Sequence, residues 1–198
     1  MKNLLLTLLL LSFSSCKTEA QNKPTNLSES ALELIHKKVD YDPSYFSIDY
    51  PNGDIPSGKG VCTDVIIRAY RSLGVDLQKE VHEDMKSNFK AYPQNWNLKT
   101  TDKNIDHRRV PNLMTYFKRK GAAKPISSFA KDYLPGDVVS WSLGGSITHI
   151  GIVVHKESKD GKRNLIVHNI GAGQVLEDCL FDYKIIGHYR YQTEIRKQ

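Results

Sequence analysis

The sequence predicts an α+β fold in which N-terminal helices pack on an antiparallel β-sheet. Apolar residues recur at helical spacing in the first part of the chain, up to about residue 121. From residue 137 onward the segments are short, β-branched or aromatic, and turn-forming residues separate them. Helices that precede strands, rather than alternate with them, favour α+β over a parallel α/β architecture. The 198 residues suffice for one domain with its own core, and no internal repeat is visible.

The first element is an export signal over residues 1–16. A basic start at Lys2 precedes a run of leucines and then small residues. The apolar run is too short to span a bilayer as a mature helix. The ending "FSSC" resembles a lipoprotein box, so Cys16 is the candidate lipidation site. Plain secretion, with cleavage near Cys16 or Ala20, is the alternative.

Residues 17–30 are polar and are expected to form a flexible tether before the domain at 31–198. We therefore expect an exported monomer, in the periplasm or as an outer-membrane lipoprotein of a Gram-negative bacterium, with membrane contact only through the lipid. The net charge of +6 comes from scattered basic residues. It suits an acidic polymer, an anionic envelope surface or simple solvation. No nucleic-acid-binding module is present, so nucleic acid is not an expected partner.

Three helices follow in order. "LSESALELIHKKV" opens the domain, with Ser28 as a candidate cap. Residues 40–60 are rich in Pro, Gly, Asp and Tyr and indicate a loop. Cys62 then begins an amphipathic helix that Gly74 ends. A helix over "DLQKEVHEDMKSNF" and another over "VPNLMTYFKRKG", separated by a loop, complete the helical part.

Four segments are expected to form the sheet. A turn at residues 135–137 leads into the first strand, and a turn at 158–163 separates the second strand from the third. The strands are "DVVSWSL", "THIGIVVH", "RNLIVHNIG" and "YKIIGHYRYQ".

Cys62 is the candidate nucleophile because it stands at a helix start. The unpaired N–H groups there carry positive partial charge, which stabilises a thiolate and predicts a pKa below the free value of about 8.5. A buried inert cysteine is the plain alternative. A disulfide between Cys62 and Cys179 is a further alternative in an exported protein. Cys179 otherwise reads as a packed small side chain.

Two histidines supply candidate partners for that thiol. His149 begins one predicted strand and His168 ends the next. If the strands pair through the turn near residue 160, the two side chains meet at one edge of the sheet. His149 would then act as the base and His168 would orient it. Asn169 is the competing orienter, but adjacent strand residues point to opposite faces, so only one of the two reaches His149.

The ordered motifs "GVCTDV", "PGDVVSW", "THIGIVV" and "LIVHNIG" resemble those of NlpC-type cell-wall peptidases in the papain-like superfamily. The resemblance implies a catalytic cysteine, a catalytic histidine and a third polar residue at Cys62, His149 and the following strand. Such enzymes often carry a tyrosine about a dozen residues before the cysteine, and Tyr50 stands there.

A more extensive resemblance covers the chain from about Lys37 to Tyr191. "GVCTDVIIRAYR", "NIDHRRVPNL", "YLPGDVVSW" and "GHYRY" are similar to a bacterial family known as domain of unknown function twelve-eighty-seven. The resemblance implies a papain-like fold and a Cys–His hydrolase but supplies no substrate. "VCTD" replaces the usual "DCSG", which places Asp64 two residues after the cysteine. We expect Asp64 to complement the helix start or to meet Arg68.

The stretch "NIDHRR" permits two interpretations. In the first, Asp106 simply caps the next helix while the arginines are solvated. Alternatively Asp106, His107 and Arg108 lie on a loop over the cleft, where Arg108 or Arg109 grips a substrate carboxylate. A metal site through His107, Asp106 and His82 has no ligand spacing behind it. No metal and no cofactor are therefore predicted.

Together these residues predict an exported cysteine hydrolase that cleaves an amide or peptide bond of peptidoglycan or of another envelope substrate. Cys62 attacks the carbonyl, His149 moves the proton, and His168 holds His149. The Cys62 N–H and, by resemblance, Tyr50 stabilise the oxyanion. Trp141 is a core residue or a groove wall beside the thiol. The alternative is a catalytically inactive binding module for the cell wall or envelope on the same fold.

Overall fold

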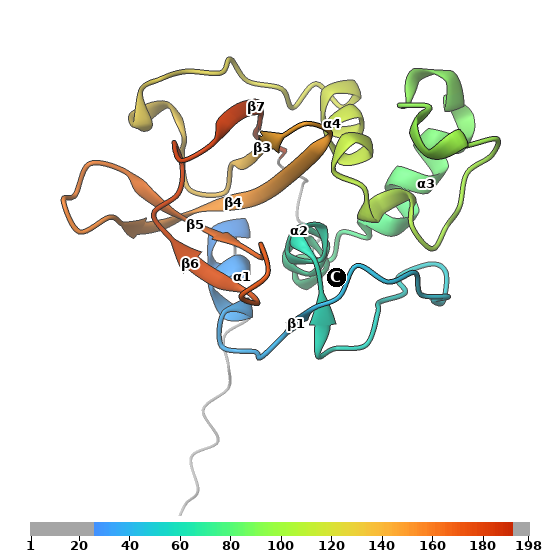
Figure 1. Ribbon diagram of the computed structural model, residues 1–198, viewed down its shortest axis with the longest axis horizontal. Coiled ribbons are helices and arrows are strands. Elements are labelled where there is room, and N and C mark those ends of the chain that lie inside the picture. Colours follow the sequence, from blue (N-terminus) through green and yellow to red (C-terminus); the bar gives the residue numbers. More distant parts are fainter. Residues whose placement is uncertain (1–25, 192–198) are drawn as a thin grey trace, which may run out of the picture.

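The computed structural model describes residues 26–191 and has the predicted α+β architecture. The predicted signal segment, Cys16 and most of the expected tether lie outside these residues. Four α-helices accompany a five-stranded sheet in the described part (Figure 1). The helices are α1 (Leu27–Leu34), α2 (Cys62–Ser72), α3 (Leu77–Ser87) and α4 (Val110–Arg119).

The sheet has the strand order β6-β5-β4-β3-β7, and each neighbouring pair is antiparallel. A separate parallel pair, β1 (Asp40–Tyr41) with β2 (Lys59–Gly60), lies within the expected loop. The strands of the sheet are β3 (Val138–Gly144), β4 (Ile147–Glu157), β5 (Asn164–His168), β6 (Val175–Glu177) and β7 (Lys184–Tyr189).

The helix ends follow the sequence signals, with one shift at the start. Gly74 follows α2 with φ of 84°, a left-handed conformation that glycine adopts without strain. The first helix begins at Leu27 rather than after Ser28, because the Asn26 side chain accepts a hydrogen bond from the Glu29 N–H at 3.0 Å. The expected tether therefore ends before Leu27, and Ser28 is not the cap. Its hydroxyl instead lies 2.7 Å from His155 Nδ1.

The two faces of the sheet carry different apolar clusters. On one face, the side chains of β3, β4 and β5 pack with the helices in a cluster that includes Cys62, Val65, Val138, Ile150 and Val167. The opposite face has a smaller cluster, which consists of Tyr133, Val139, Trp141, Val153, Ile166, Cys179 and Leu180. No helix within residues 26–191 combines the length and apolar character needed to cross a membrane.

Candidate functional site

Cys62 is the first residue of α2, and the polar groups around its sulfur are backbone N–H groups. The Asp64 carboxylate accepts a hydrogen bond from the Val61 N–H at 2.7 Å, which closes the first turn of the helix. The Cys62 side chain is buried in the cluster between α2 and the sheet. Backbone N–H groups of Ile150, Thr63 and Cys62 itself stabilise its charged form. The thiol therefore lies against the amide that directly follows His149.

The expected low pKa of the Cys62 thiol is corrected by this burial. Desolvation raises the pKa to about 12, and the nearby Asp64 carboxylate adds to the increase. The amide of Ile150 opposes the shift without reversing it. A helix N-terminus lowers a cysteine pKa when water also reaches the sulfur, and Cys62 is only 7% exposed. The thiol is consequently protonated at neutral pH in this conformation.

Asp64 holds the helix start to a distant arginine. Arg108 Nε donates to Asp64 Oδ1 at 3.0 Å and Arg108 Nη2 donates to Asp64 Oδ2 at 3.1 Å, and both side chains are buried. Arg108 also donates to the Ser44 carbonyl at 3.1 Å. Its guanidinium is therefore already engaged within the protein, which argues against the predicted grip on a substrate carboxylate. Arg68, the other expected partner of Asp64, instead pairs with Asp54 at 3.0 Å.

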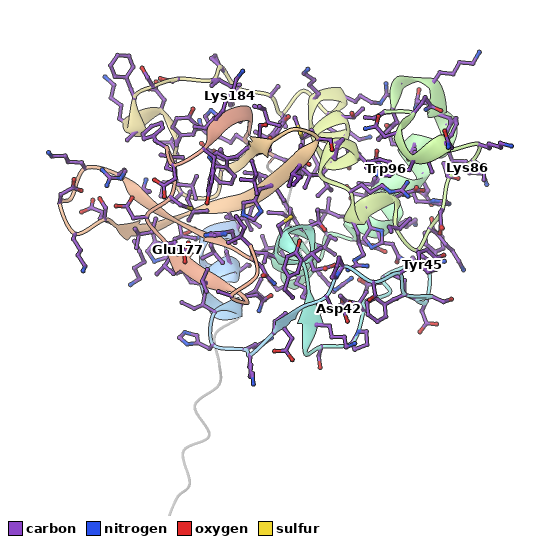
Figure 2. All side chains as sticks on the ribbon, in the orientation of Figure 1. Asp42, Tyr45, Lys86, Trp96, Glu177 and Lys184 are labelled. Atoms are coloured by element: carbon purple, nitrogen blue, oxygen red, sulfur yellow. The ribbon has the colours of Figure 1, made fainter. Side chains whose placement is uncertain are left out.

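His149 and His168 meet at the end of the β4–β5 pair. His149 Nε2 lies 3.0 Å from His168 Nδ1, and His168 Nε2 lies 3.1 Å from Glu177 Oε2. Glu177 comes from β6, at the sheet surface (Figure 2). The Trp141 ring stacks on His149 with centroids 5.8 Å apart. The side chains of Glu177, His168 and His149 thus form one hydrogen-bonded chain that ends at His149.

Burial keeps both imidazoles neutral. It lowers the pKa of His149 to about 3, with a smaller contribution from the neighbouring His168. Burial also lowers the pKa of His168, although Glu177 opposes this. Within residues 26–191, His149 Nδ1 has no hydrogen-bond partner. That nitrogen is the one left to exchange a proton with another group.

The structure brings Cys62 next to the His149–Ile150 peptide without joining thiol and imidazole by a hydrogen bond in the described residues. Side chains alternate along β4, so Ile150 faces α2 while His149 lies with Trp141 on the other face. Both residues stand near the start of β4, where β5 has already ended at His168. The thiol and the histidine chain therefore lie near the same end of β4, on opposite faces of the sheet.

Comparisons with known proteins decide the family. Residues 28–191 match the family model described as "Domain of unknown function (DUF1287)". The chain belongs to this family. It is also 52% identical over 169 residues to the uncharacterized protein YijF of Escherichia coli K12, which covers 84% of this chain and 82% of that protein. No solved structure matches the chain.

Asn169 binds the loop that precedes Cys62 in this DUF1287 protein. Its side-chain amide donates to the Gly60 carbonyl at 3.2 Å, and its Oδ1 accepts from the Gly171 N–H at 3.2 Å. Asn169 is fully buried and makes no hydrogen bond to His149 in the described residues. It ties the β5–β6 connection to the entry of α2.

Tyr50, the predicted oxyanion residue, contacts α3, and a different tyrosine, Tyr41, lies near the Cys62 thiol. The Tyr50 hydroxyl donates to Glu83 on α3 at 3.4 Å, and its ring meets His82 edge-on. Tyr41 in β1 is close enough to Cys62 for a thiolate there to raise the tyrosine pKa, after burial as the larger cause. The pairing of β1 with β2 positions Tyr41, and no motif or spacing in the sequence signals it.

The "NIDHRR" residues form a second buried polar group in the DUF1287 fold. Asp106 begins a 3₁₀ turn over Asp106–Arg108, and its Oδ2 lies 3.0 Å from Nδ1 of His82 on α3. His107 is buried, which lowers its pKa to about 3, and its Nδ1 has no partner within residues 26–191. The Arg109 guanidinium stacks over Trp96 at 4.4 Å. Asp106 therefore binds a histidine of α3 and does not cap the following helix, α4.

Both cysteines of the described residues are free thiols. Cys62 belongs to the cluster on the helical face and Cys179 to the cluster on the opposite face. A Cys62–Cys179 disulfide is accordingly absent from the structure of residues 26–191. Cys179 packs as a small side chain, as its apolar neighbours in the sequence predict.

Proposed function

We propose that this DUF1287 protein is an exported cysteine hydrolase with a papain-like, NlpC-type fold that cleaves an amide or peptide bond in peptidoglycan. The observation that carries the proposal is the chain His149–His168–Glu177, whose His149 end directly precedes Ile150, the residue whose backbone N–H contacts the Cys62 sulfur at the start of α2. A cysteine at a helix start, packed on a sheet that carries a histidine near the start of β4, supports the papain-like assignment.

The carboxylate of Glu177 sets the direction of the hydrogen bonds. It accepts a proton from His168 Nε2, which leaves His168 Nδ1 as the acceptor for His149 Nε2–H. Neutral His149 then presents a bare lone pair at Nδ1. This is the tautomer that a general base beside a thiol requires.

The reaction begins from a neutral thiol and a neutral imidazole. The Cys62 sulfur attacks the substrate carbonyl while its proton moves to His149 Nδ1, because burial disfavours a preformed ion pair. The N–H of Cys62 at the helix start stabilises the oxyanion. His149 then protonates the leaving amine, and water hydrolyses the thioester by the same route. This transfer requires the His149 imidazole, which stacks on Trp141 on the opposite face of the sheet, to turn toward α2.

The test uses full-length protein and purified peptidoglycan, with released fragments identified by mass spectrometry. Wild type should release new fragments, and Cys62→Ala should release none. His149→Ala should lose at least a hundredfold in rate, whereas His36→Ala, which removes an exposed histidine far from this cluster in sequence, should match wild type. Digestion by Cys62→Ala at the wild-type rate would end the proposal.

A second candidate is a binding module on the same fold. The observation that favours it is the raised pKa of the deeply buried Cys62 thiol. Such a module would sediment with insoluble peptidoglycan and release no fragments. Cys62→Ala would sediment equally well, because the thiol would then contribute only packing.

A further inference from the structure

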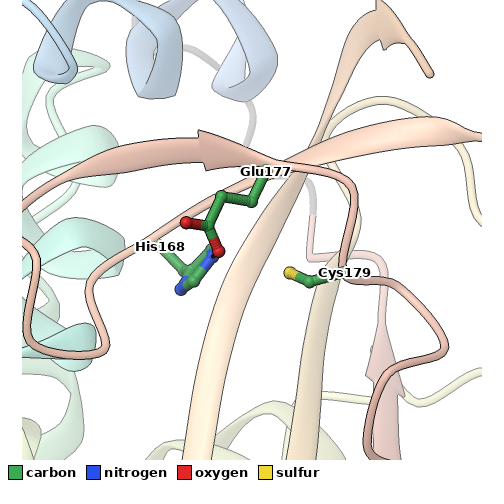
Figure 3. Close-up of side chains that lie close together, drawn as sticks. All are labelled: His168, Glu177 and Cys179. Carbon is green, nitrogen blue, oxygen red and sulfur yellow. Dashed lines mark hydrogen bonds and ion pairs between the residues drawn. The ribbon is translucent and has the colours of Figure 1, made fainter. Parts of the chain in front are cut away.

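Three side chains with metal-binding atoms meet on the face of the sheet opposite α2. Ligand atoms of His168, Glu177 and Cys179 all lie within 4.8 Å of one another. His168 ends β5, Glu177 ends β6, and Cys179 follows two residues later in the connection to β7. Figure 3 shows the Cys179 side chain pointing toward the Glu177 carboxylate and the His168 ring.

The Cys179 thiol is not hydrogen-bonded to any other side chain in the described part of the chain, although the residue packs in the apolar cluster. The residue is 6% exposed. A buried thiol directed at an imidazole and a carboxylate is the arrangement that a metal site needs. Apolar packing alone does not require the neighbouring Glu177 or His168.

The donor set and its dimensions suit zinc. One nitrogen, one oxygen and one sulfur are the ligand types of tetrahedral Zn²⁺, at bond lengths of about 2.0–2.3 Å. Ligand atoms in such a site are separated by roughly 3.5 Å, and His168 Nε2 and Glu177 Oε2 are already 3.1 Å apart. The Cys179 sulfur lies within 4.8 Å of the other two ligand atoms, so an inward movement of about 1 Å would bring it to this spacing. Three protein ligands leave a fourth position for water.

We propose that His168, Glu177 and Cys179 bind a zinc-type divalent cation and that this cation switches the hydrolase off. The switch rests on the proposed function, whereas the binding does not. The metal takes His168 Nε2, so the neutral ring carries its proton on Nδ1 and donates to His149 Nε2. His149 then holds its own proton on Nδ1 and has no lone pair for the Cys62 proton. Two protons remain on the histidine pair, and the Cys179 thiol proton leaves to solvent.

Binding is tested on the full-length protein with Co²⁺ and Zn²⁺. Cobalt should give a sulfur-to-metal charge-transfer absorption, and added zinc should remove it. Cys179→Ser should abolish that absorption, and Glu177→Gln should weaken zinc binding at least tenfold. Cys62→Ser, the matched thiol control, should bind as wild type. Loss of the absorption in Cys62→Ser and its retention in Cys179→Ser would place the metal at the other cysteine and overturn the proposal, as would the absence of saturable binding.

The switch is tested by each variant's rate with zinc divided by its own metal-free rate. Wild type should lose at least tenfold at saturating zinc, and Cys179→Ser should lose less than twofold. Equal inhibition of the two would overturn the switch, because zinc would then be acting elsewhere. A metal-free wild type without activity would overturn the proposed function and the switch together, while the cobalt absorption still decides the binding.

Discussion

The regions around Cys62 and Cys179 share deep burial and differ in what surrounds the sulfur. Burial raises the pKa of each thiol to about 12. Backbone amides at a helix start and at Ile150 surround Cys62, whereas His168 and Glu177 side chains face Cys179. Amides stabilise a developing thiolate without binding a metal, and imidazole with carboxylate binds a metal. A thiol's role therefore follows from its neighbours, since the pKa does not distinguish these two.

The comparison is tested most strongly by alkylation of each thiol alone. Cys179→Ser leaves Cys62, and Cys62→Ser leaves Cys179. At pH 8 each should react with iodoacetamide on the order of a thousandfold more slowly than free cysteine, because little thiolate exists when the pKa is about 12. The rate should keep rising above pH 10, as measured by mass spectrometry.

The unfolded protein is the control for alkylation, since both thiols should then react as free cysteine. A plateau for Cys62 below pH 8 in the native protein would show that water reaches its sulfur. The positive partial charge at the helix start would then determine the pKa of the Cys62 thiol, as the sequence alone predicts. The pKa values of the two thiols would then differ.

The next largest effect concerns the buried ion pair between Asp64 and Arg108, which holds the start of α2 behind Cys62. Arg108→Ala leaves the buried Asp64 carboxylate without its bidentate partner. The free energy of unfolding should fall by about 3–5 kcal/mol, measured by urea denaturation. Arg119→Ala, which breaks a pair with Asp84 at the surface, should cost at most about 1 kcal/mol. Equal losses would show that the Asp64 pair does not anchor α2.

The helices and the long strands follow from the sequence because their signals are local. Glycines at the ends of α2 and α4, and the change of apolar period near residue 137, place these elements within a few residues. The meeting of His149 and His168 follows equally, since one turn at 158–163 fixes the strand pair. Local signals thus supplied two of the three residues in the histidine chain.

The rest depends on tertiary packing that no local pattern contains. Glu177 lies in β6, which has only three residues and therefore no readable alternation. The partner of Asp64 is 44 residues away in sequence. Tyr50 has the spacing expected of an oxyanion residue, but its loop carries it to α3. Burial of Cys62, which inverts the expected pKa shift, is likewise a property of the assembled fold.

A second histidine–carboxylate pair, His188 with Asp137, lies on the Cys179 side of the sheet and can be compared with His168 and Glu177. His188 Nε2 lies 2.7 Å from Asp137, which also accepts two hydrogen bonds from Arg190. Burial alone would raise the pKa of Asp137, but the bonds from Arg190 and His188 outweigh it and lower that pKa. Unlike Glu177, which is half-exposed, Asp137 is almost completely buried. We infer a structural role for Asp137.

Asp137→Asn should cost about 1–3 kcal/mol of unfolding free energy at pH 7. A lowered carboxyl pKa stabilises the fold above the unfolded value of about 3.9, and this stabilisation is lost as the pH falls through the lower folded value. The deficit of Asp137→Asn should therefore shrink below about pH 4, as measured by urea denaturation across pH. Glu177→Gln should change stability by less than about 1 kcal/mol. A deficit that stays constant with pH would show that the Asp137 charge is not what stabilises the fold.

The smallest expected effect is on kcat/KM, and it distinguishes Tyr41 from Tyr50 as the tyrosine that acts beside Cys62. Tyr41 lies near the thiol and is 45% exposed. A hydrogen bond from its hydroxyl to a bound substrate would therefore form in contact with water. Tyr41→Phe should therefore lower kcat/KM on peptidoglycan fragments by about tenfold, less than the loss of a fully enclosed oxyanion donor. Tyr50→Phe should change kcat/KM by less than about twofold, since its hydroxyl is held by Glu83. The reverse order would mean that the loop around Tyr50 moves onto Cys62 when substrate binds, and the static contrast between the two cysteine regions would have to include that movement.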